Sequence, residues 1–177
     1  MRVLAPAAGV QPCALPPGAL LARYAAAGAY TDCYATHVDR AVSHAEYVEA
    51  FYTGPLFKVE RLLLRLALAR PSTDDEARRL ADGAIVQFAA WRVEERAADQ
   101  LLMRDFGGRT RSWLMVLPAR PASAPGTLLY FGSALVPAVN ASTGGSRTGF
   151  RFRALLGFHR LYSRALLGSA RGRLERA

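Results

Sequence analysis

Five segments of the chain carry the apolar and polar pattern of β-strands. Between Tyr30 and Val38, successive side chains alternate between two sets, and the tyrosine, threonine and valine residues there favour extended structure. Four later runs are separated by charged or Gly/Pro-rich joints. They are Ile85–Glu95, Gln100–Phe106, Arg109–Leu117 and Thr127–Val136. Because these joints are short, we expect neighbouring strands to pair antiparallel, as a meander.

Two helices are predicted directly after the first strand. Ser43 and Glu46 form a capping-box pattern, in which each side chain satisfies a backbone N–H at a helix start, so a short helix should run to about Tyr52. Gly54–Pro55 then provides a stop and a restart. The following helix, Leu56–Ala69, has apolar residues on more than one face and should lie in the core.

A third short helix is predicted before the run of strands. Pro71 ends the preceding helix, and Thr73 with Glu76 forms a second capping box. Gly83 could close this helix, since glycine tolerates the left-handed conformation that often ends one.

A long C-terminal helix is predicted from Phe150 to Arg173, after a Gly-, Ser- and Thr-rich loop at Ala138–Gly149. At about 100° per residue the helix is amphipathic. Its predicted buried face holds Phe152, Leu156, His159, Ser163, Leu167 and Ala170, and its arginine face holds Arg153, Arg160, Arg164 and Arg171.

These elements describe one α+β domain. A chain of 177 residues with 51% hydrophobic residues can form a single core, whereas two independent domains would be a tight fit. Residues 1–19 contain four prolines and no periodic pattern, so we expect an extended lead-in that lies along the surface or is disordered. The domain should occupy residues 20–177.

The charge of the chain does not by itself indicate a polyanionic partner. The formal net charge is +9 and the isoelectric point about 10.4, which is typical of proteins that bind nucleic acid or acidic membranes. However, Lys58 is the only lysine, and a chain rich in arginine and alanine is what a GC-rich coding sequence produces. Nucleic-acid binding is therefore not favoured, and a solvated basic surface is the simpler interpretation.

The two cysteines and the N-terminus favour a reducing cytoplasm. Cys13 lies in the Pro-rich lead-in and Cys33 in the first strand, so neither a disulfide framework nor a thiolate metal site is predicted. Prolines interrupt the apolar stretch that a signal peptide would need, and no run approaches the roughly 20 apolar residues that span a bilayer.

The order of elements resembles the helix-grip arrangement of the START-like superfamily, which includes polyketide cyclases and lipid-transport proteins. In that fold a curved antiparallel sheet wraps a long C-terminal helix. More narrowly, the chain is similar to bacterial proteins of the domain-of-unknown-function 2867 type. The resemblance rests on GPLFKVERLLLRL, FAAWRVEERAADQLLMRDF and GFHRLYSRALLGSA and covers residues 20–172. The superfamily usually has about seven strands, whereas the pattern here predicts five.

The resemblance implies a cavity between the sheet and the C-terminal helix, where a small apolar or aromatic ligand would bind. The residues expected to line it are Asp32, Tyr34, Trp91, Met103, Arg111, Trp113, Phe131, Leu156 and His159.

The aromatic and basic residues among these candidates have two interpretations. Trp91 and Trp113 each have an arginine close by in the sequence and could hold a planar or anionic ligand, or they could be ordinary core tryptophans. Alternation places Arg111 on the same side of its strand as Trp113. An inward Arg111 needs an anion, either a ligand or a carboxylate from Asp32, Glu94 or Asp105 in a purely structural pair.

His159 is the candidate acid or base. An imidazole on a pocket-facing helix could move a proton in a cyclase or dehydratase, or it could simply hydrogen-bond to the sheet. His37 and His159 are too few and too far apart in sequence to predict a metal site, and no cofactor is predicted.

Three function classes follow from these patterns. The first is a small-molecule binding protein of unknown ligand. The second is a cyclase- or dehydratase-like enzyme that uses the same cavity, with His159 as acid or base and Asp32, Tyr34, Arg111 and Trp113 orienting the substrate. The third is a basic helix that binds an anionic membrane or a protein partner. The sequence does not indicate the oligomeric state.

Overall fold

The computed structural model describes residues 9–58, 72–119, 126–136 and 150–177, with side chains in the last range from residue 160 onward. The helices are α1 (Ala22–Ala26), α2 (His44–Thr53), α4 (Asp74–Ala81) and α5 (Phe150–Leu174). The strands are β1 (Gln11–Pro12), β2 (Tyr30–Val38), β3 (Gln87–Phe88), β4 (Trp91–Ala97), β5 (Gln100–Asp105), β6 (Thr110–Pro118) and β7 (Thr127–Leu135).

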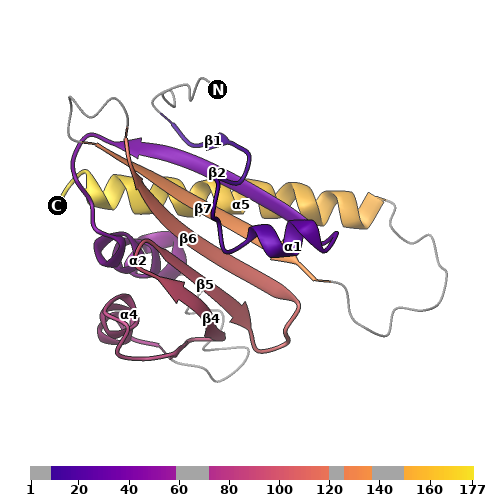
Figure 1. Ribbon diagram of the computed structural model, residues 1–177, viewed down its shortest axis with the longest axis horizontal. Helices are drawn as coiled ribbons and strands as arrows, with labels where there is room; N and C mark the ends of the chain where they lie inside the picture. Colours follow the sequence, from indigo (N-terminus) through magenta and orange to yellow (C-terminus); the bar gives the residue numbers. More distant parts are fainter. Residues whose placement is uncertain (1–8, 59–71, 120–125, 137–149) are drawn as a thin grey trace.

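The described strands form one antiparallel sheet in the order β1-β2-β7-β6-β5-β4-β3 (Figure 1). The sheet is open, because β1 and β3 are its edges and do not pair with each other. The predicted α+β class, the antiparallel sheet and the C-terminal helix are therefore confirmed. The meander β4 to β7 follows from the short joints, while β2 pairs with β7 across a large separation in sequence.

The sheet has two strands more than the sequence pattern predicts. Ala89 has a positive φ of 51°, which breaks the predicted run Ile85–Glu95 into β3 and β4. The other addition is β1, a two-residue strand in the Pro-rich lead-in that pairs with β2. Neither two-residue strand has enough alternation to be read as a strand from the sequence.

The predicted helix starts agree with the structure. Ser43 and Glu46 form the complete capping box of α2, and Thr73 and Glu76 form that of α4. The predicted helix Leu56–Ala69 falls mostly outside the described residues. At its start, the described residues 55–58 are helical. The predicted loop Ala138–Gly149 also falls outside them.

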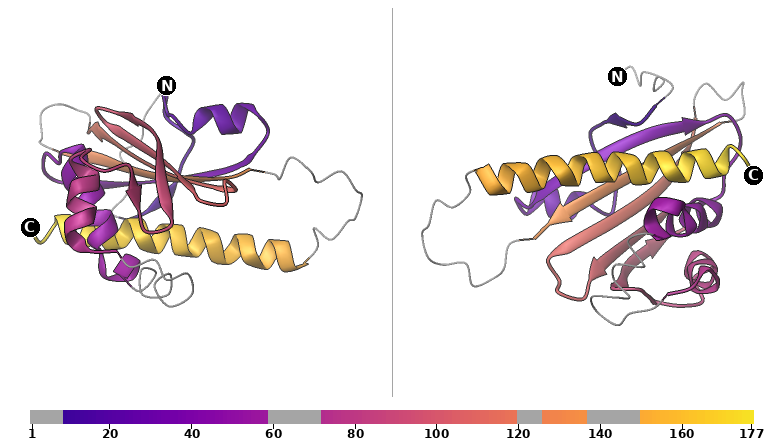
Figure 2. Two further views of the ribbon diagram at one scale, coloured as in Figure 1. Left: turned by 90° about the horizontal axis from the view of Figure 1, so that it is seen from below. Right: turned by 180° about the vertical axis from the view of Figure 1, so that it is seen from behind.

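Both faces of the sheet are covered (Figure 2). On one face, α2, α4 and α5 enclose a core that includes Tyr47, Phe51 and Leu167. On the other face, the segment that leads into and includes α1 covers a second core that includes Leu21 and Trp113. The described part of the lead-in, residues 9–19, therefore lies against the sheet, and the five-residue α1 is an element that the sequence pattern did not predict.

The amphipathic pattern of α5 is confirmed for the side chains that the structure describes. Ser163, Leu167 and Ala170 are buried, whereas Arg160 and Arg164 are exposed and Arg171, on the same predicted face, is half-buried. The helix packs on β2, β7 and α2.

Candidate functional site

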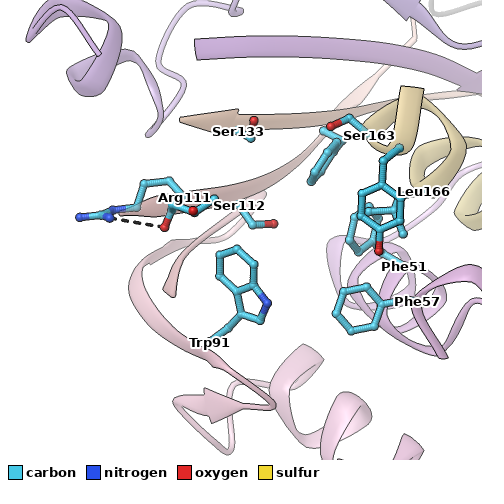
Figure 3. A pocket seen from close by; sticks show the side chains of 11 residues that line it. Phe51, Phe57, Trp91, Arg111, Ser112, Ser133, Ser163 and Leu166 are labelled. Atoms are coloured by element: carbon cyan, nitrogen blue, oxygen red, sulfur yellow. Dashed lines mark hydrogen bonds between the residues drawn. The ribbon is translucent and has the colours of Figure 1, made fainter. Parts of the chain in front are cut away.

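A cavity of about 170 Å³ lies between the sheet, α2 and α5 (Figure 3). It opens on the same face of the sheet as the larger core. Its walls come from α2 and the residues just after it, from β4, β6 and β7, and from α5. The lining residues are Phe51, Phe57, Trp91, Thr110, Arg111, Ser112, Phe131, Ser133, Tyr162, Ser163 and Leu166.

The floor of the cavity exists because two serines stand opposite each other in the sheet. Ser112 of β6 is in register with Ser133 of β7, and both are buried. One pair further along, Leu114 stands opposite Phe131 and fills the corresponding space with large side chains. Small side chains at the serine pair thus leave a hollow that the close-packed core around it does not fill.

Aromatic side chains form the wall on the α2 side. The ring centroids of Phe51 and Phe131 are 5.0 Å apart, and those of Phe51 and Phe57 are 6.1 Å apart. Phe51 lies on α2, which begins at the Ser43 capping box. Trp91 of β4 lies across the cavity from this wall and is half-buried (Figure 3).

The α5 side of the cavity carries a buried hydroxyl group. Ser163 is 1% exposed, and its Oγ has no hydrogen-bond partner among the described residues. A buried hydroxyl without a partner costs free energy, commonly 1–3 kcal/mol in proteins. A ligand in the cavity could supply the missing partner.

The charge of Arg111 lies outside the cavity, although the residue forms part of its wall. Figure 3 shows the Arg111 side chain pointing away from the other labelled residues. Its Nε lies 2.6 Å from Glu94 Oε2 and donates to the Tyr24 hydroxyl at 2.8 Å. The guanidinium also stacks on the Tyr24 ring, 4.8 Å from its centroid. Arg111 is the one charged residue among the lining residues that the structure describes, so the cavity interior is neutral.

Glu94 is the carboxylate that pairs with Arg111, one of three candidates that the sequence left open. A β-bulge between Val93 and Glu95 shifts the register of β4, and both Glu94 and Glu95 contact Arg23 of α1. Burial acts to raise the pKa of Glu94, but the Tyr24 hydroxyl, Arg111 and Arg23 outweigh it and lower that pKa overall. The cluster therefore fastens α1 to the sheet.

Trp113 and Met103 do not line the cavity. Trp113 lies in the core on the opposite face and donates its indole N–H to Gln100 Oε1 at 2.9 Å. It shares that face with Arg111 and Met115, as strand alternation predicts, but the helix on that face is α1 and not α5. Met103 is on the α5 side and fully buried, with its sulfur accepting a hydrogen bond from the Tyr52 hydroxyl at 3.1 Å.

Asp32 and Tyr34 lie beside the cavity rather than in its wall. Asp32 Oδ1 accepts hydrogen bonds from the Ser133 hydroxyl at 2.6 Å and from its backbone N–H at 3.1 Å. Tyr34 is buried opposite Phe131 on the neighbouring strand. Burial, followed by the negative charge of Asp32, raises the pKa of Tyr34 to about 12, so its hydroxyl keeps its proton at neutral pH.

Of the nine predicted ligand residues, Trp91, Arg111 and Phe131 thus line the cavity, and the guanidinium of Arg111 is directed away from it. The side chains of Leu156 and His159 lie outside the described residues. His37 Nδ1 lies 3.0 Å from Asp39 Oδ1. In the described ranges, no group of three or more His, Cys, Asp or Glu side chains could hold a metal ion.

Strand alternation indicates which face of the sheet the serines occupy. Once Arg111 and Trp113 share one face of β6, Ser112 must lie on the other, in register with a second small polar residue. The conspicuous side chains belong to the face that α1 covers. The inconspicuous serines mark the face with space for a ligand.

Comparisons with protein-family models, with curated proteins and with solved structures found no match to this chain. None of the helices in the described ranges combines the length and apolar composition needed to cross a bilayer.

Proposed function

We propose that the protein binds a small, neutral, mainly apolar molecule in the cavity between the sheet and α5. The ligand best suited to the cavity has one aromatic ring and one hydrogen-bonding group. The observation that carries this proposal is the unpartnered Ser163 hydroxyl beside a cavity whose accessible surface is mainly apolar. Binding sites of this kind combine apolar walls with a few placed polar groups.

The size of the cavity limits the ligand. Ligand sites for drug-sized molecules measure about 300–1,000 Å³, which is larger than the 170 Å³ found here. A dry apolar cavity of about 150 Å³ is sufficient for benzene. A single substituted ring therefore matches the available volume.

The charge of the ligand is limited by the same walls. An ionised group buried without a partner carries a large desolvation cost. Arg111 cannot serve as its partner from the position described, because its guanidinium is engaged by Glu94 and Tyr24. A neutral phenol-like molecule avoids this cost, and its hydroxyl can pair with Ser163.

The proposal includes the helix-grip character of the fold. In START-like proteins, which the sequence resembles, ligands bind between the sheet and the last helix. The cavity lies between the same two elements here. We propose binding rather than turnover because Asp32, Arg111 and Trp113, the residues suggested for orienting a substrate, hydrogen-bond to other groups of the protein.

Phenol, toluene and benzoate form a probe set that tests the proposal by isothermal titration calorimetry. Phenol should bind with a dissociation constant of about 0.1–1 mM, equivalent to about 4–5.5 kcal/mol. Toluene should bind more weakly than phenol, because it leaves Ser163 unpaired, and benzoate should not bind measurably. Equal binding of benzoate, or no binding of either neutral ring, would contradict the proposal.

Two serine variants on α5 test the hydroxyl. Ser163→Ala should weaken phenol binding about 3- to 10-fold and leave toluene binding unchanged, since a neutral hydrogen bond contributes about 0.5–1.5 kcal/mol. Ser169→Ala is the matched control, because Ser169 Oγ is also buried without a partner among the described residues but lies outside the cavity. Neither variant should lower the melting temperature, so a loss of affinity would not reflect misfolding.

A third variant fills the cavity. Ser112→Leu adds a bulky apolar side chain at the floor and should abolish the binding of both phenol and toluene. If it binds both rings as the wild type does while remaining folded by circular dichroism, the rings bind elsewhere.

A further inference from the structure

The two cysteines of the chain meet on the face of the sheet opposite the cavity. Cys13 follows β1, and Cys33 lies within β2. Their sulfur atoms are 3.4 Å apart, and the backbone N–H of Cys13 donates to the Cys33 carbonyl at 3.0 Å. No other cysteine occurs in the sequence, so the fold has brought together the whole thiol content of the protein.

The local register suits a disulfide bond. Pro12 stands opposite Tyr34, so antiparallel pairing places Cys13 opposite Cys33. Opposed residues of antiparallel strands have Cα atoms about 4.5–5.5 Å apart, within the range of about 4.4–6.8 Å that disulfides span. A bond of about 2.05 Å requires the two sulfurs to approach by little more than an ångström.

We infer that Cys13 and Cys33 are an oxidation site, at which Cys13 reacts with hydrogen peroxide and Cys33 resolves the product into a reversible intramolecular disulfide. This inference goes beyond the proposed ligand binding and does not depend on it. The two roles are assigned by exposure, since Cys13 is half-buried whereas Cys33 is only 6% exposed.

Electrostatics supports the same assignment of roles. The hydrogen bond from the Cys33 thiol lowers the pKa of Cys13, with burial opposing it. The hydrogen bond to Cys13, burial and the charges of Cys13 and Asp32 raise the pKa of Cys33 far above its ordinary value. The thiolate is the reactive form, so the first attack comes from the more exposed Cys13.

Hydrogen peroxide is the only oxidant that the reaction needs. The Cys13 thiolate attacks one peroxide oxygen and the O–O bond breaks, which leaves a sulfenic acid on Cys13 and releases water once the leaving oxygen is protonated. The Cys33 sulfur then attacks the Cys13 sulfur, the S–S bond forms, and the sulfenic hydroxyl leaves as water with the Cys33 proton. The two thiols lose two electrons, which reduce the peroxide to water, and a thiol reductant reverses the change.

The disulfide would tie the N-terminal segment to the sheet. This segment pairs with the outer edge of β2 through β1 and covers the second core with Leu15 and Leu20. Sheet edges and terminal segments are the places where proteins open most easily. A covalent link across a separation of 20 residues should therefore suppress local opening.

The test uses the full chain, reduced and then treated with hydrogen peroxide. Intact mass should show the loss of two hydrogens in a monomer, and peptide mapping should show Cys13 linked to Cys33. Loop-closure entropy predicts a melting temperature roughly 5–10 °C higher for the oxidised protein. Disulfide-linked dimers, or two thiols that persist after treatment, would overturn the inference.

Single variants separate the two roles. With Cys33→Ala, the sulfenic acid on Cys13 should accumulate and be captured by dimedone, and with Cys13→Ala the same dose should leave Cys33 unmodified. Alanine suits both sites, because a free buried cysteine behaves as a small apolar side chain. Peroxide should not shift the melting temperature of either variant, which controls for methionine oxidation. Equal reactivity of Cys33 in the absence of Cys13 would contradict the assignment.

Discussion

His44 is a buried histidine at the first position of α2, with 8% of its surface exposed. Burial, together with the positive charge of Arg96, lowers its pKa to about 4, although Asp99 and a hydrogen bond to the Leu114 backbone act in the opposite direction. Its Nε2 has no partner among the described residues. The imidazole is therefore neutral in the folded protein at neutral pH.

This low pKa makes the fold sensitive to mild acid. The unfolded chain takes up the proton near the ordinary histidine pKa of 6.5, whereas the folded protein does so only near 4. The contribution of neutral His44 to the free energy of unfolding is therefore fully present above pH 6.5. It is lost as the pH decreases to about 4, by at most roughly 3 kcal/mol. Urea unfolding of wild type and His44→Asn across this range measures the effect. The variant should lose much less stability, whereas parallel losses would exclude His44, and His37→Asn serves as the control.

Glu94 stabilises the fold by pairing with the buried charge of Arg111. The Arg111 side chain is only 10% exposed, so Glu94→Gln leaves a guanidinium without its counter-ion and should lower the free energy of unfolding by about 2–3 kcal/mol. Glu95→Gln is the matched control, because Glu95 is 42% exposed and pairs with Arg23 at the surface, where such pairs contribute less than about 1 kcal/mol. Equal losses in urea unfolding would refute the distinction.

The acid dependence of the Glu94 pair lies at lower pH than that of His44. The pKa of Glu94 is lowered from 4.5 in the folded protein, so its contribution is present above that value and is lost as the pH falls through the folded pKa. The two groups should therefore act in largely separate pH ranges.

Residue identities alone did not determine the partner of Arg111. Asp32, Glu94 and Asp105 lie in three different strands, β2, β4 and β5, and the bulge in β4 accompanies the contact of Glu94 with α1. Asp32 instead accepts hydrogen bonds from Ser133, and Asp105 accepts one from the Thr110 backbone at 2.7 Å. A bulge of one residue leaves no clear pattern in a strand of seven, so this choice could not be predicted.

At the scale of elements, β7 depends on a glycine at its centre. Gly132 lies opposite both Cys33 of β2 and Trp113 of β6. A Cβ atom there would lie 2.8 Å from Leu21 Cδ2, 2.9 Å from the Asp32 carbonyl and 3.0 Å from the Trp113 ring. The glycine lets the indole ring and the segment before α1 pack directly on the strand.

Gly132→Ala should therefore lower the free energy of unfolding by about 2–3 kcal/mol, because overpacking at a backbone atom cannot be relieved by a rotamer change. Gly168→Ala on α5 is the control. Its new Cβ would meet only Val10 Cγ2 at 3.8 Å, and alanine should stabilise the helix by up to about 1 kcal/mol. Urea unfolding compares the two, and a neutral Gly132→Ala would contradict the described packing.

The sequence predicted the elements better than their surroundings. Both capping boxes, the long strands and the exposed arginines of α5 follow from local patterns that the structure confirms. Alternation also groups Arg111 with Trp113 correctly. Alternation does not state which face of a sheet meets which helix, and here both faces are covered, so the two most conspicuous side chains of β6 lie away from α5.

At the scale of the whole molecule, the two proposed sites lie with different cores, on opposite faces of the sheet. The face covered by α1 is filled by Trp113, Tyr130 and the N-terminal segment, and it carries the cysteine pair. The face covered by α2 and α5 contains the hollow above Ser112 and Ser133. A ligand site on one face and an oxidation site on the other can therefore be tested separately.

Crystals of the protein soaked with 4-bromophenol test the ligand site most directly, because the bromine can be located by its anomalous scattering. We expect one bromine peak between Trp91 and the Phe51–Phe57 wall, with the phenol hydroxyl within hydrogen-bonding distance of Ser163 Oγ. The peak should disappear in Ser112→Leu. An empty cavity at a saturating concentration, or a peak confined to the outer surface, would contradict the claim that this protein binds a small aromatic molecule between its sheet and its last helix.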